Sequence, residues 1–471
     1  MEKYEFKGKI LIVGFGSIGQ GVLPLILRHF SVTPERVTIV TADKRGEDVA
    51  AEYGVRFIVD PLLPHNHQDI VRGHIGPGDF LVNVSVEVSS AALIEYCQKN
   101  GILYLDTVIE PWEGSYTDPS RSISQRSNYA LREEVLKLRS LPLTGPRPTA
   151  VLAHGANPGL VSHFTKQALL NIAEDTGLSV DVPSTQRAWA TLARDLGVKV
   201  IHIAERDTQE SPVPKSIGEF VNTWSIDGFH SESSQPSEMG WGTHEKKLPD
   251  DGHEHDFGCG AAIYLDQPSF LTTARSWTPT AKAQRGWIVT HHESISIADY
   301  LTLKEDGKAV YRPTVHYAYH PCDGAVLSLD ELAANNGVLQ KAQRLISEDI
   351  LQGGVDELGV LLMGHAKNAY WYGSRLSIDE ARRLVPHNNA TGLQVTASII
   401  GAMVWAIQNP TAGLVDADEV DHQVLMDVAR PYLGEMLGVY TDWTPIEGRG
   451  TLFPEQFDAD DPWQFENFRV S

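Results

Sequence analysis

The chain has 471 residues, of which 42% are hydrophobic and 21% are charged, so it is long enough for two or three domains with cores of their own. Its formal net charge of -22 at pH 7 argues against nucleic acid or an anionic membrane surface as a partner and leaves cationic ligands as candidates. Three cysteines without a Cys-x-x-Cys spacing indicate neither a disulfide framework nor a cysteine-rich zinc site. Because the N-terminus has no signal-peptide pattern and no run reaches about 18 apolar residues, we expect a soluble, cytoplasmic protein.

A glycine-rich turn between an apolar strand and a helix opens the chain. Ile10 to Val13 is the predicted strand, GFGSIG occupies positions 14 to 19, and Val22 to Phe30 has the length of a helix. In a dinucleotide-binding unit the first glycine makes the turn, the second admits a pyrophosphate and the third allows close packing, with the pyrophosphate at the helix N-terminus. The expected cofactor-binding residues are Gly14, Gly16, Ser17, Ile18 and Gly19.

An aspartate follows the second predicted strand, Val37 to Val40. Asp43 lies 24 residues beyond Gly19, where a carboxylate can hydrogen-bond a ribose 2′-hydroxyl and would repel a 2′-phosphate. This position favours NAD over NADP. In the alternative interpretation, Asp43 only opens a turn, and the two bases that follow it serve a phosphate.

Polar residues also follow the later strands of the predicted parallel sheet. Phe80 to Val84 and Ile102 to Leu105 are apolar runs separated by a helix, as in an alternating strand and helix fold. A doubly wound sheet binds its ligand at the carboxyl ends of its strands. We therefore assign Ser85 and Thr107 to the cofactor site, together with Ala156 of a later glycine-containing loop.

A linker rich in proline and glycine at residues 141–148 marks the first domain boundary. From about Pro183 to Tyr319 strand-like runs dominate, including Ser294 to Leu303 with its alternating serines and isoleucines. The predicted α/β architecture is a Rossmann domain at 1–148 with a doubly wound parallel sheet, and a second α+β domain at 149–385 with a mixed or antiparallel sheet, which carries the substrate site and the dimer contact. C-terminal helices at 386–471, including a buried apolar helix rather than a membrane span, are expected to return to the Rossmann domain.

The interval from residue 201 to residue 260 is strongly acidic. It holds twelve carboxylates and four bases, interleaved with Trp224 and Trp241. Carboxylates attract ammonium ions by charge, and a tryptophan face attracts them by roughly 2 kcal/mol when the pair is desolvated. The interval is either a polyamine pocket or a solvated acidic loop whose tryptophans are partly core.

Two segments contain histidines beside other residues that can bind a metal or transfer protons. His244, His253, His255 and Cys259 could suggest zinc, but their setting among acids and turn-forming residues favours a solvated loop, and we expect no metal. The sequence His291-His292-Glu293 follows a predicted strand, where acid–base catalysis, amine binding or a structural histidine are all open. The chain shows neither a catalytic serine elbow nor a phosphate-binding Walker loop, which argues against a hydrolase or a kinase.

Long strings of the sequence, from about Gly8 to Arg449, resemble the bacterial homospermidine synthases, relatives of the saccharopine and carboxynorspermidine dehydrogenases. They include VGFGSIGQG, DTVIEPW, GANPG, GVKVIHIAERDTQ, FVNTWSIDGF, HESISIAD and ELGVLLMGHAKNAYWYGS. The resemblance implies a homodimeric, NAD-dependent enzyme that joins two putrescine molecules into homospermidine with loss of ammonia. Spermidine can also donate the aminobutyl group, which releases 1,3-diaminopropane.

In the reaction that the resemblance implies, one putrescine carbon gives a hydride to NAD and becomes an imine. Ammonia leaves when water or the second amine attacks, and the new Schiff base takes the hydride back. Each step needs a neutral amine at the reacting carbon while the far ammonium stays anchored. Carboxylates suit both tasks, provided that their environments differ.

The resemblance also assigns roles by motif. The catalytic residues would be Trp224, Glu205, Asn157, His291 and Glu293, and the substrate amines would be bound by Glu232, Glu110 and Glu87. Trp224 would steer the cation over its ring. At Glu87 the family pattern has an aspartate, so this side chain is one methylene longer.

Two alternatives remain at this point. A saccharopine-type or carboxynorspermidine-type dehydrogenase would need arginine or lysine to hold a substrate carboxylate. The segments expected at the pocket are dominated by acids and aromatic residues instead, which favours a substrate that is cationic at both ends. The second alternative is a dinucleotide-binding sensor without catalysis.

Overall fold

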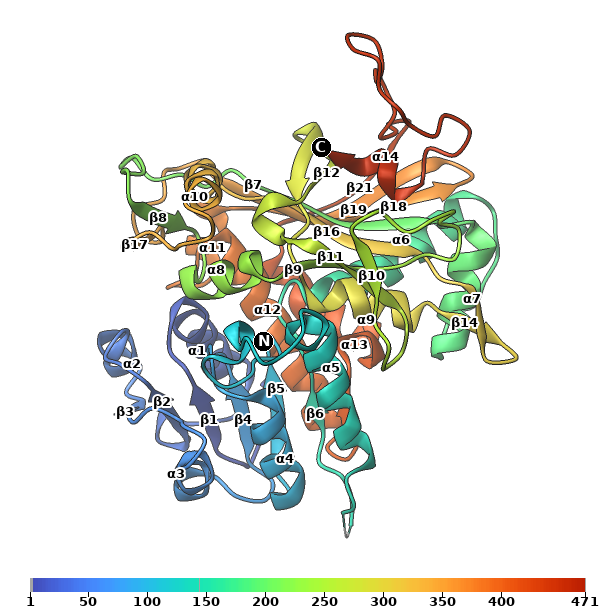
Figure 1. Ribbon diagram of the computed structural model, residues 1–471. Coiled ribbons are helices and arrows are strands. Elements are labelled where there is room, and N and C mark those ends of the chain that lie inside the picture. The colour runs from blue at the N-terminus through green and yellow to red at the C-terminus, as the bar shows by residue number, and fades with distance from the viewer. Residues whose placement is uncertain (1–2, 144, 471) are drawn as a thin grey trace. The chain divides into compact units, whose positions relative to one another are not determined.

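The computed structural model describes residues 3–143 and 145–470, and Figure 1 shows its ribbon. The chain divides into two compact units. The first combines the residues up to Leu160 with Leu376–Gly434, and the second combines Val161–Arg375 with the residues from Glu435 onward. The sequence predicts these boundaries after residues 148 and 385 instead.

The first unit contains a seven-stranded sheet in the order β20-β6-β5-β4-β1-β2-β3. Every neighbouring pair in it is parallel. Its strands are β1 (Ile10–Val13), β2 (Val37–Thr41), β3 (Arg56–Val59), β4 (Phe80–Asn83), β5 (Leu103–Asp106), β6 (Ala150–Val151) and β20 (Leu414–Val415). The strand order reverses between β1 and β4, which creates the crevice where such sheets bind ligands. The predicted Rossmann-type parallel sheet is confirmed.

The helices of the first unit include one that is apolar enough to cross a membrane. They are α1 (Ser17–His29), α2 (Glu47–Glu52), α3 (His67–His74), α4 (Ser90–Asn100), α5 (Asn128–Leu136), α11 (Ile378–Leu384), α12 (Ala390–Gln408) and α13 (His422–Ala429). The apolar helix is α12, with a mean hydropathy of 1.5, and 83% of its apolar window is buried. It packs against α1 and α13, as a core helix does.

The second unit is built on an eleven-stranded sheet whose main path runs β10-β11-β9-β16-β7-β18-β19-β21. These strands are β7 (Val200–Asp207), β9 (Pro236–Gly240), β10 (Gly252–Glu254), β11 (Ala262–Pro268), β16 (Thr314–His320), β18 (Val355–His365), β19 (Asn368–Ser377) and β21 (Glu435–Thr441). The pair of β16 with β7 is parallel, whereas β18 is antiparallel to β7. The prediction of a mixed second sheet is therefore confirmed.

Smaller elements complete this unit. The strands β12 (Thr273–Thr278), β13 (Lys282–Trp287) and β22 (Arg469–Val470) join the large sheet, while β8 (Glu219–Asn222) pairs with β17 (Ala342–Leu345) and β14 (Leu303–Glu305) with β15 (Lys308–Tyr311). The helices are α6 (Leu160–Asp175), α7 (Gln186–Leu196), α8 (Ile226–Ser234), α9 (His292–Tyr300), α10 (Asp323–Ala334) and α14 (Phe465–Phe468).

The strand predicted at Ser294 to Leu303 is wrong, because α9 occupies most of it. The alternation of serine and isoleucine had indicated a half-buried strand. In the structure every residue from His292 to Ala298 is buried, so this part of the helix has no solvent-exposed face. Its sequence therefore lacks the 3.6-residue repeat of apolar and polar residues that indicates a surface helix.

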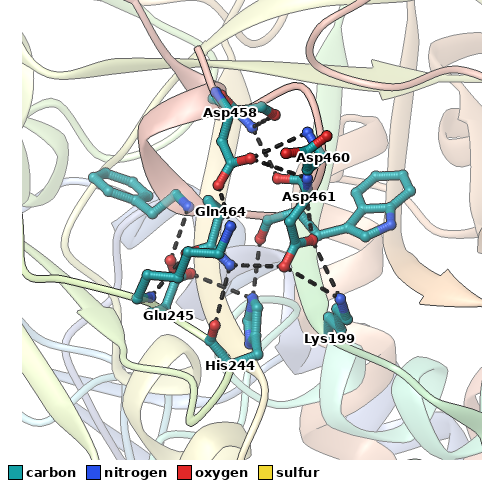
Figure 2. Close-up of polar contacts among 11 residues, drawn as sticks. Lys199, His244, Glu245, Asp458, Asp460, Asp461 and Gln464 are labelled. Atoms are coloured by element: carbon teal, nitrogen blue, oxygen red, sulfur yellow. Dashed lines mark hydrogen bonds and ion pairs between the residues drawn. The ribbon is translucent and has the colours of Figure 1, made fainter.

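The end of the chain belongs to the second unit, so residues 386–471 do not all return to the first unit as predicted. β21 extends the large sheet beside β19, and β22 pairs with β12, where the red end of the chain lies in Figure 1. Figure 2 shows Asp461 between Lys199 and Gln464, with Lys199 Nζ 3.2 Å from a carboxylate oxygen. These contacts and the hydrogen bond from Phe465 N to Glu245, at 3.0 Å, attach the last residues to the unit.

Candidate functional site

The turn after β1 has the geometry of a phosphate-binding loop. Gly14 has a φ of 85°, and a Cβ placed on it would lie 2.7 Å from the Cα of Ser85, so the turn requires glycine. A Cβ on Gly16 would meet nothing within 4 Å, which leaves this amide accessible. Because Gly16 is also the N-cap of α1, no side chain of its own covers the first amides of the helix. Those amides and the helix dipole favour an anion there.

Close packing also explains the third glycine of the motif. A Cβ on Gly19 would lie 2.9 Å from the carbonyl oxygen of Gly14. Ser17 and Ile18 stand at the first two positions of α1, so their amides belong to the unpaired first turn. The turn, the open amide and the close helix contact together fit a dinucleotide pyrophosphate.

Asp43 lies beyond the end of β2 and is paired with Arg45. Its two carboxylate oxygens accept hydrogen bonds from the backbone and the side chain of Arg45, each at 2.8 Å. These bonds lower the pKa of Asp43, so the group is ionised at neutral pH. The side chain of Asp43 remains 44% exposed, which leaves it accessible to a ribose hydroxyl.

The other predicted cofactor residues lie in the same unit. Ser85 contacts the glycine turn and donates a hydrogen bond from its hydroxyl to Asn83 at 2.6 Å. Thr107 follows β5 and lies close to Gly155, at the start of the loop that carries Ala156. The carboxyl edge of the sheet therefore brings the predicted residues of separate segments near one another.

Asn157 lies in the same short loop, which is closed by backbone hydrogen bonds. The amide of Gly155 donates to the carbonyl of Pro158 at 2.7 Å, and the amide of Leu160 donates to the carbonyl of Gly155 at 2.9 Å. This closure holds the backbone around Asn157 in place at the start of α6.

Glu87 and Glu110 are neighbours in the first unit. The backbone amide of Glu87 points to a carboxylate oxygen of Glu110 at 3.4 Å, and the hydroxyl of Tyr116 lies 3.4 Å from the same oxygen. Glu87 has a positive φ of 58°, an uncommon backbone conformation for a residue with a side chain. The structure therefore brings the backbone of Glu87, an exposed residue, to the buried carboxylate of Glu110.

Three buried carboxylates share one face of the second unit's sheet. Glu205 and Asp207 alternate along β7, and Asp356 on β18 is the cross-strand partner of Asp207. All three are 2% exposed or less. We call Glu205, Asp207 and Asp356 the acidic cluster. The sequence analysis did not single out Asp207 or Asp356: the alternation of Glu205 with Asp207 was a usable signal, whereas only strand pairing places Asp356 beside them.

Burial changes the protonation of the acidic cluster. It raises the pKa of Glu205, although a hydrogen bond donated by Tyr317 opposes the increase. Burial likewise raises the pKa of Asp207, against hydrogen bonds from Thr223 and Gln209. Carboxyl groups in such an environment gain stability from a cationic ligand and can accept a proton near neutral pH.

His291 is held between two carboxylates at the start of α9. Its Nε2 lies 3.0 Å from Glu232 and its Nδ1 lies 3.3 Å from Glu293. Burial acts to lower the pKa of His291, but the two carboxylates outweigh it and raise the pKa well above its usual value. The structure therefore joins three predicted site residues through a buried imidazolium.

Trp224 lies on the loop between β8 and α8, next to the same group of residues. Its Nε1 donates a hydrogen bond to the hydroxyl of Tyr319 at 3.2 Å. The preceding Thr223 donates to Asp207 at 2.7 Å, which ties this loop to the acidic cluster. Trp224 is half-buried, so its ring is partly available to a ligand.

The acidic interval does not form a single pocket. Trp241 packs in the core with Phe465, their ring centroids 5.9 Å apart, so it is not a pocket residue. The solvated-loop prediction is wrong for His255, whose side chain is 0% exposed and lies 3.6 Å from Glu238. Within residues 3–143 and 145–470, no group of three or more histidine, cysteine or acidic residues is arranged to hold a metal ion.

The fold and the two sites define a dehydrogenase-type protein with a dinucleotide-binding unit and a separate acidic unit. Two family models agree with this division: the saccharopine dehydrogenase NADP binding domain matches residues 10–141, and the saccharopine dehydrogenase C-terminal domain matches residues 155–441.

Full-length relatives narrow the assignment. The chain is 53% identical to a homospermidine synthase of Blastochloris viridis, over 99% of this chain and 98% of the relative. It is 49% identical to a homospermidine synthase of Mesorhizobium japonicum, over 99% and 97%. A crystal structure of the homospermidine synthase from Legionella pneumophila in complex with NAD is 50% identical and has a TM-score of 0.93, with coverage of 100% of this chain and 99% of that one. The chain belongs to the homospermidine synthase family, which confirms the family predicted from its motifs.

Proposed function

We propose that this protein is an NAD-dependent homospermidine synthase that converts two putrescine molecules into homospermidine and ammonia. With spermidine as the aminobutyl donor, the second product is 1,3-diaminopropane. The observation that carries the proposal is the buried acidic cluster beside Trp224 and the His291 imidazolium, in a chain about half identical to homospermidine synthases along its whole length. The same relatives give no support to the carboxynorspermidine-type dehydrogenase or to the sensor.

The charge of the second unit's site suits a substrate with an ammonium group at each end. Glu205, Asp207 and Asp356 present carboxyl groups on one face of the sheet, and a bound ammonium would compensate their charge. An arginine or lysine clamp for a substrate carboxylate is not part of this group of residues. A diamine therefore fits better than an amino acid.

The carboxyl groups and His291 can carry out two different proton transfers. A carboxyl group whose pKa is raised by burial can take the proton of a substrate ammonium near neutral pH, which makes the amine neutral at the reacting carbon. The His291 imidazolium, hydrogen-bonded to Glu232 and Glu293, can return a proton to the departing ammonia. The ring of Trp224 stabilises the cation between these steps.

The first unit supplies the cofactor site. When bound there, NAD would supply reversible hydride transfer at the amine-bearing carbon of the substrate. The amides at Gly16, Ser17 and Ile18 would hold the pyrophosphate, and Asp43 would bind the ribose hydroxyl. The Legionella protein was crystallised with NAD, which supports the choice of NAD although the matching family model carries NADP in its description.

The protein acts as a homodimer in the cytoplasm, with polyamines as its ligands and neither nucleic acid nor membrane as a partner. The net charge of -22 supports the absence of phosphate-rich partners. Size-exclusion chromatography with light scattering measures the oligomeric state directly, and a monomer at micromolar concentration would overturn the dimer.

The test is to incubate the purified protein with NAD and putrescine that carries deuterium on both amine-bearing carbons, and to analyse the amines by mass spectrometry. Homospermidine that retains all of its deuterium, with ammonia and without net NADH absorbance, is the expected result. Accumulation of NADH without a coupled amine would indicate a simple amine dehydrogenase and overturn the proposal. No change in either signal would favour the sensor.

A further inference from the structure

Two tyrosines of β16 lie stacked in the middle of the second unit's site. Tyr317 and Tyr319 alternate along the strand and so point to one face of the sheet. Their ring centroids are 5.1 Å apart and their planes differ by 10°. Both side chains are almost fully buried, at 2% and 0% exposure. Neither has a role assigned by sequence motif.

Tyr317 contacts two of the predicted catalytic residues. Its hydroxyl donates a hydrogen bond to Glu205, and its ring centroid lies 4.6 Å from that of the His291 imidazole. The hydrogen bond stabilises the ionised form of Glu205 against the effect of burial. Tyr317 therefore affects both the orientation and the charge of this carboxyl group.

Tyr319 contacts another predicted catalytic residue, Trp224. Its hydroxyl accepts the hydrogen bond from Trp224 Nε1, and it is the direct strand partner of Glu205. Phe229 packs against both aromatic rings, with its ring centroid 5.2 Å from Trp224 and 5.7 Å from Tyr319. The indole is the flat surface on which a cation must be centred, within about 6 Å of the ring, and its Nε1 hydrogen bond sets the rotation of that surface.

We infer that Tyr317 and Tyr319 are the positioning residues of this site: Tyr319 sets the plane of the Trp224 ring, and Tyr317 sets the orientation of Glu205, so the stacked pair keeps the cation-binding ring and the carboxyl group in register. The catalytic consequence rests on the proposed function. The structural link between the tyrosines and their partners does not, and the two can be tested separately.

The first experiment replaces Tyr319 by phenylalanine, which removes only the hydroxyl. We expect kcat/KM for putrescine to fall about tenfold, the scale of one lost hydrogen bond at a reacting site, while the Kd for NAD stays unchanged. The matched control is Tyr311→Phe, since the Tyr311 hydroxyl also makes a 2.9 Å hydrogen bond, to the carbonyl of Val198, in the same unit. Equal kinetics for wild type and Tyr319→Phe would overturn the role of Tyr319.

The orientation of the indole can be measured without activity. In protein labelled with 5-fluorotryptophan, the fluorine resonance of Trp224 is identified by its loss in Trp224→Phe. We expect this resonance to move or broaden in Tyr319→Phe and to stay in place in Tyr311→Phe. If the wild type makes no homospermidine, the proposed function fails, and this spectrum decides alone: a changed resonance supports the positioning of Trp224 and an unchanged one overturns it.

Tyr317→Phe tests the second half of the inference through pH. Loss of the donated hydrogen bond removes an interaction that lowers the pKa of Glu205, so the acid limb of the kcat/KM profile should move to higher pH. A merely structural role would lower the whole profile without moving it. A profile that keeps its wild-type limb, or the same displacement in Tyr311→Phe, would overturn the role of Tyr317.

Discussion

The cofactor turn of the first unit and the acidic cluster of the second are built in opposite ways. The turn consists of backbone amides from one continuous stretch, and it depends on the absence of a side chain at Gly14, Gly16 and Gly19. The acidic cluster consists of side chains from β7 and β18. Two tyrosines of β16 connect it to other segments, Tyr319 to Trp224 and Tyr317 to His291. A backbone site depends on local geometry, whereas a side-chain site depends on the register of strands far apart in sequence.

We expect the largest effect at Glu205, where a substitution should lower turnover without changing cofactor binding. Glu205→Gln removes the ionisable group and keeps the shape, so kcat should fall about a thousandfold, within the range for loss of a general acid or base. The Kd for NAD should not change, because the cofactor turn shares no segment with β7. Glu210→Gln, at an exposed position, is the control. A comparable loss of NAD affinity in Glu205→Gln would show that Glu205 also contributes to cofactor binding.

Burial of titratable groups in the second unit extends beyond the acidic cluster, to the imidazoles of His202 and His316, whose ring centroids are 4.0 Å apart and whose planes are tilted by 38°. Burial lowers the pKa of His316 from 6.5 to about 4. As the pH falls, His316 is protonated in the unfolded chain before it is protonated in the folded one. Its contribution to the free energy of unfolding is therefore fully present above about pH 6.5 and is lost between pH 6.5 and pH 4, by up to about 3 kcal/mol.

Urea unfolding of wild type and His316→Phe at pH 7.5 and pH 4.5 measures this contribution. We expect the variant to lose less stability on acidification than the wild type, whatever its stability at pH 7.5. His65→Gln, at an exposed histidine, should behave like the wild type. An identical acid loss in wild type and His316→Phe would show that other groups control the acid stability of the protein.

A smaller effect is expected at Trp224, where substitutions change the size of the aromatic ring and the quadrupole that attracts a cation. Trp224→Ala should lower kcat/KM about 30-fold, which corresponds to the loss of roughly 2 kcal/mol of cation–π attraction. Trp224→Phe should lose clearly less, because a smaller aromatic ring retains part of that attraction. Steady-state kinetics with putrescine decide the matter, and equal losses in the two variants would remove the cation–π role.

The smallest effect concerns the first unit at Asp43. Asp43→Ala should weaken NAD binding about fivefold, the scale of one hydrogen bond to the ribose, with kcat at saturating NAD preserved. Because Asp43 is paired with Arg45, the same change frees a guanidinium and should improve the relative affinity for NADP. Titration calorimetry with both dinucleotides measures each part. An unchanged NAD affinity would assign Asp43 to the turn alone.

The local sequence predicted the architecture well where the signal was periodic and continuous. The strand, glycine turn and helix at the N-terminus, the parallel sheet that contains them and the mixed second sheet are all present. The prediction failed at α9, where burial of successive residues hides the helical repeat of apolar and polar positions. It also failed at the end of the chain, where β21 and β22 pair with strands of the second unit.

The sequence by itself determined the cofactor turn, because the three glycines, the strand before them and the helix after them act within one short segment. Its family motifs also named Glu205, Trp224 and His291 as site residues. Only the tertiary structure placed Asp356 beside Asp207. It also stacked Tyr317 on Tyr319, so that one hydroxyl contacts the Glu205 carboxylate and the other the Trp224 indole. The physical reason is that strand register, which no local pattern encodes, decides which side chains are buried together, and burial in turn decides their charge.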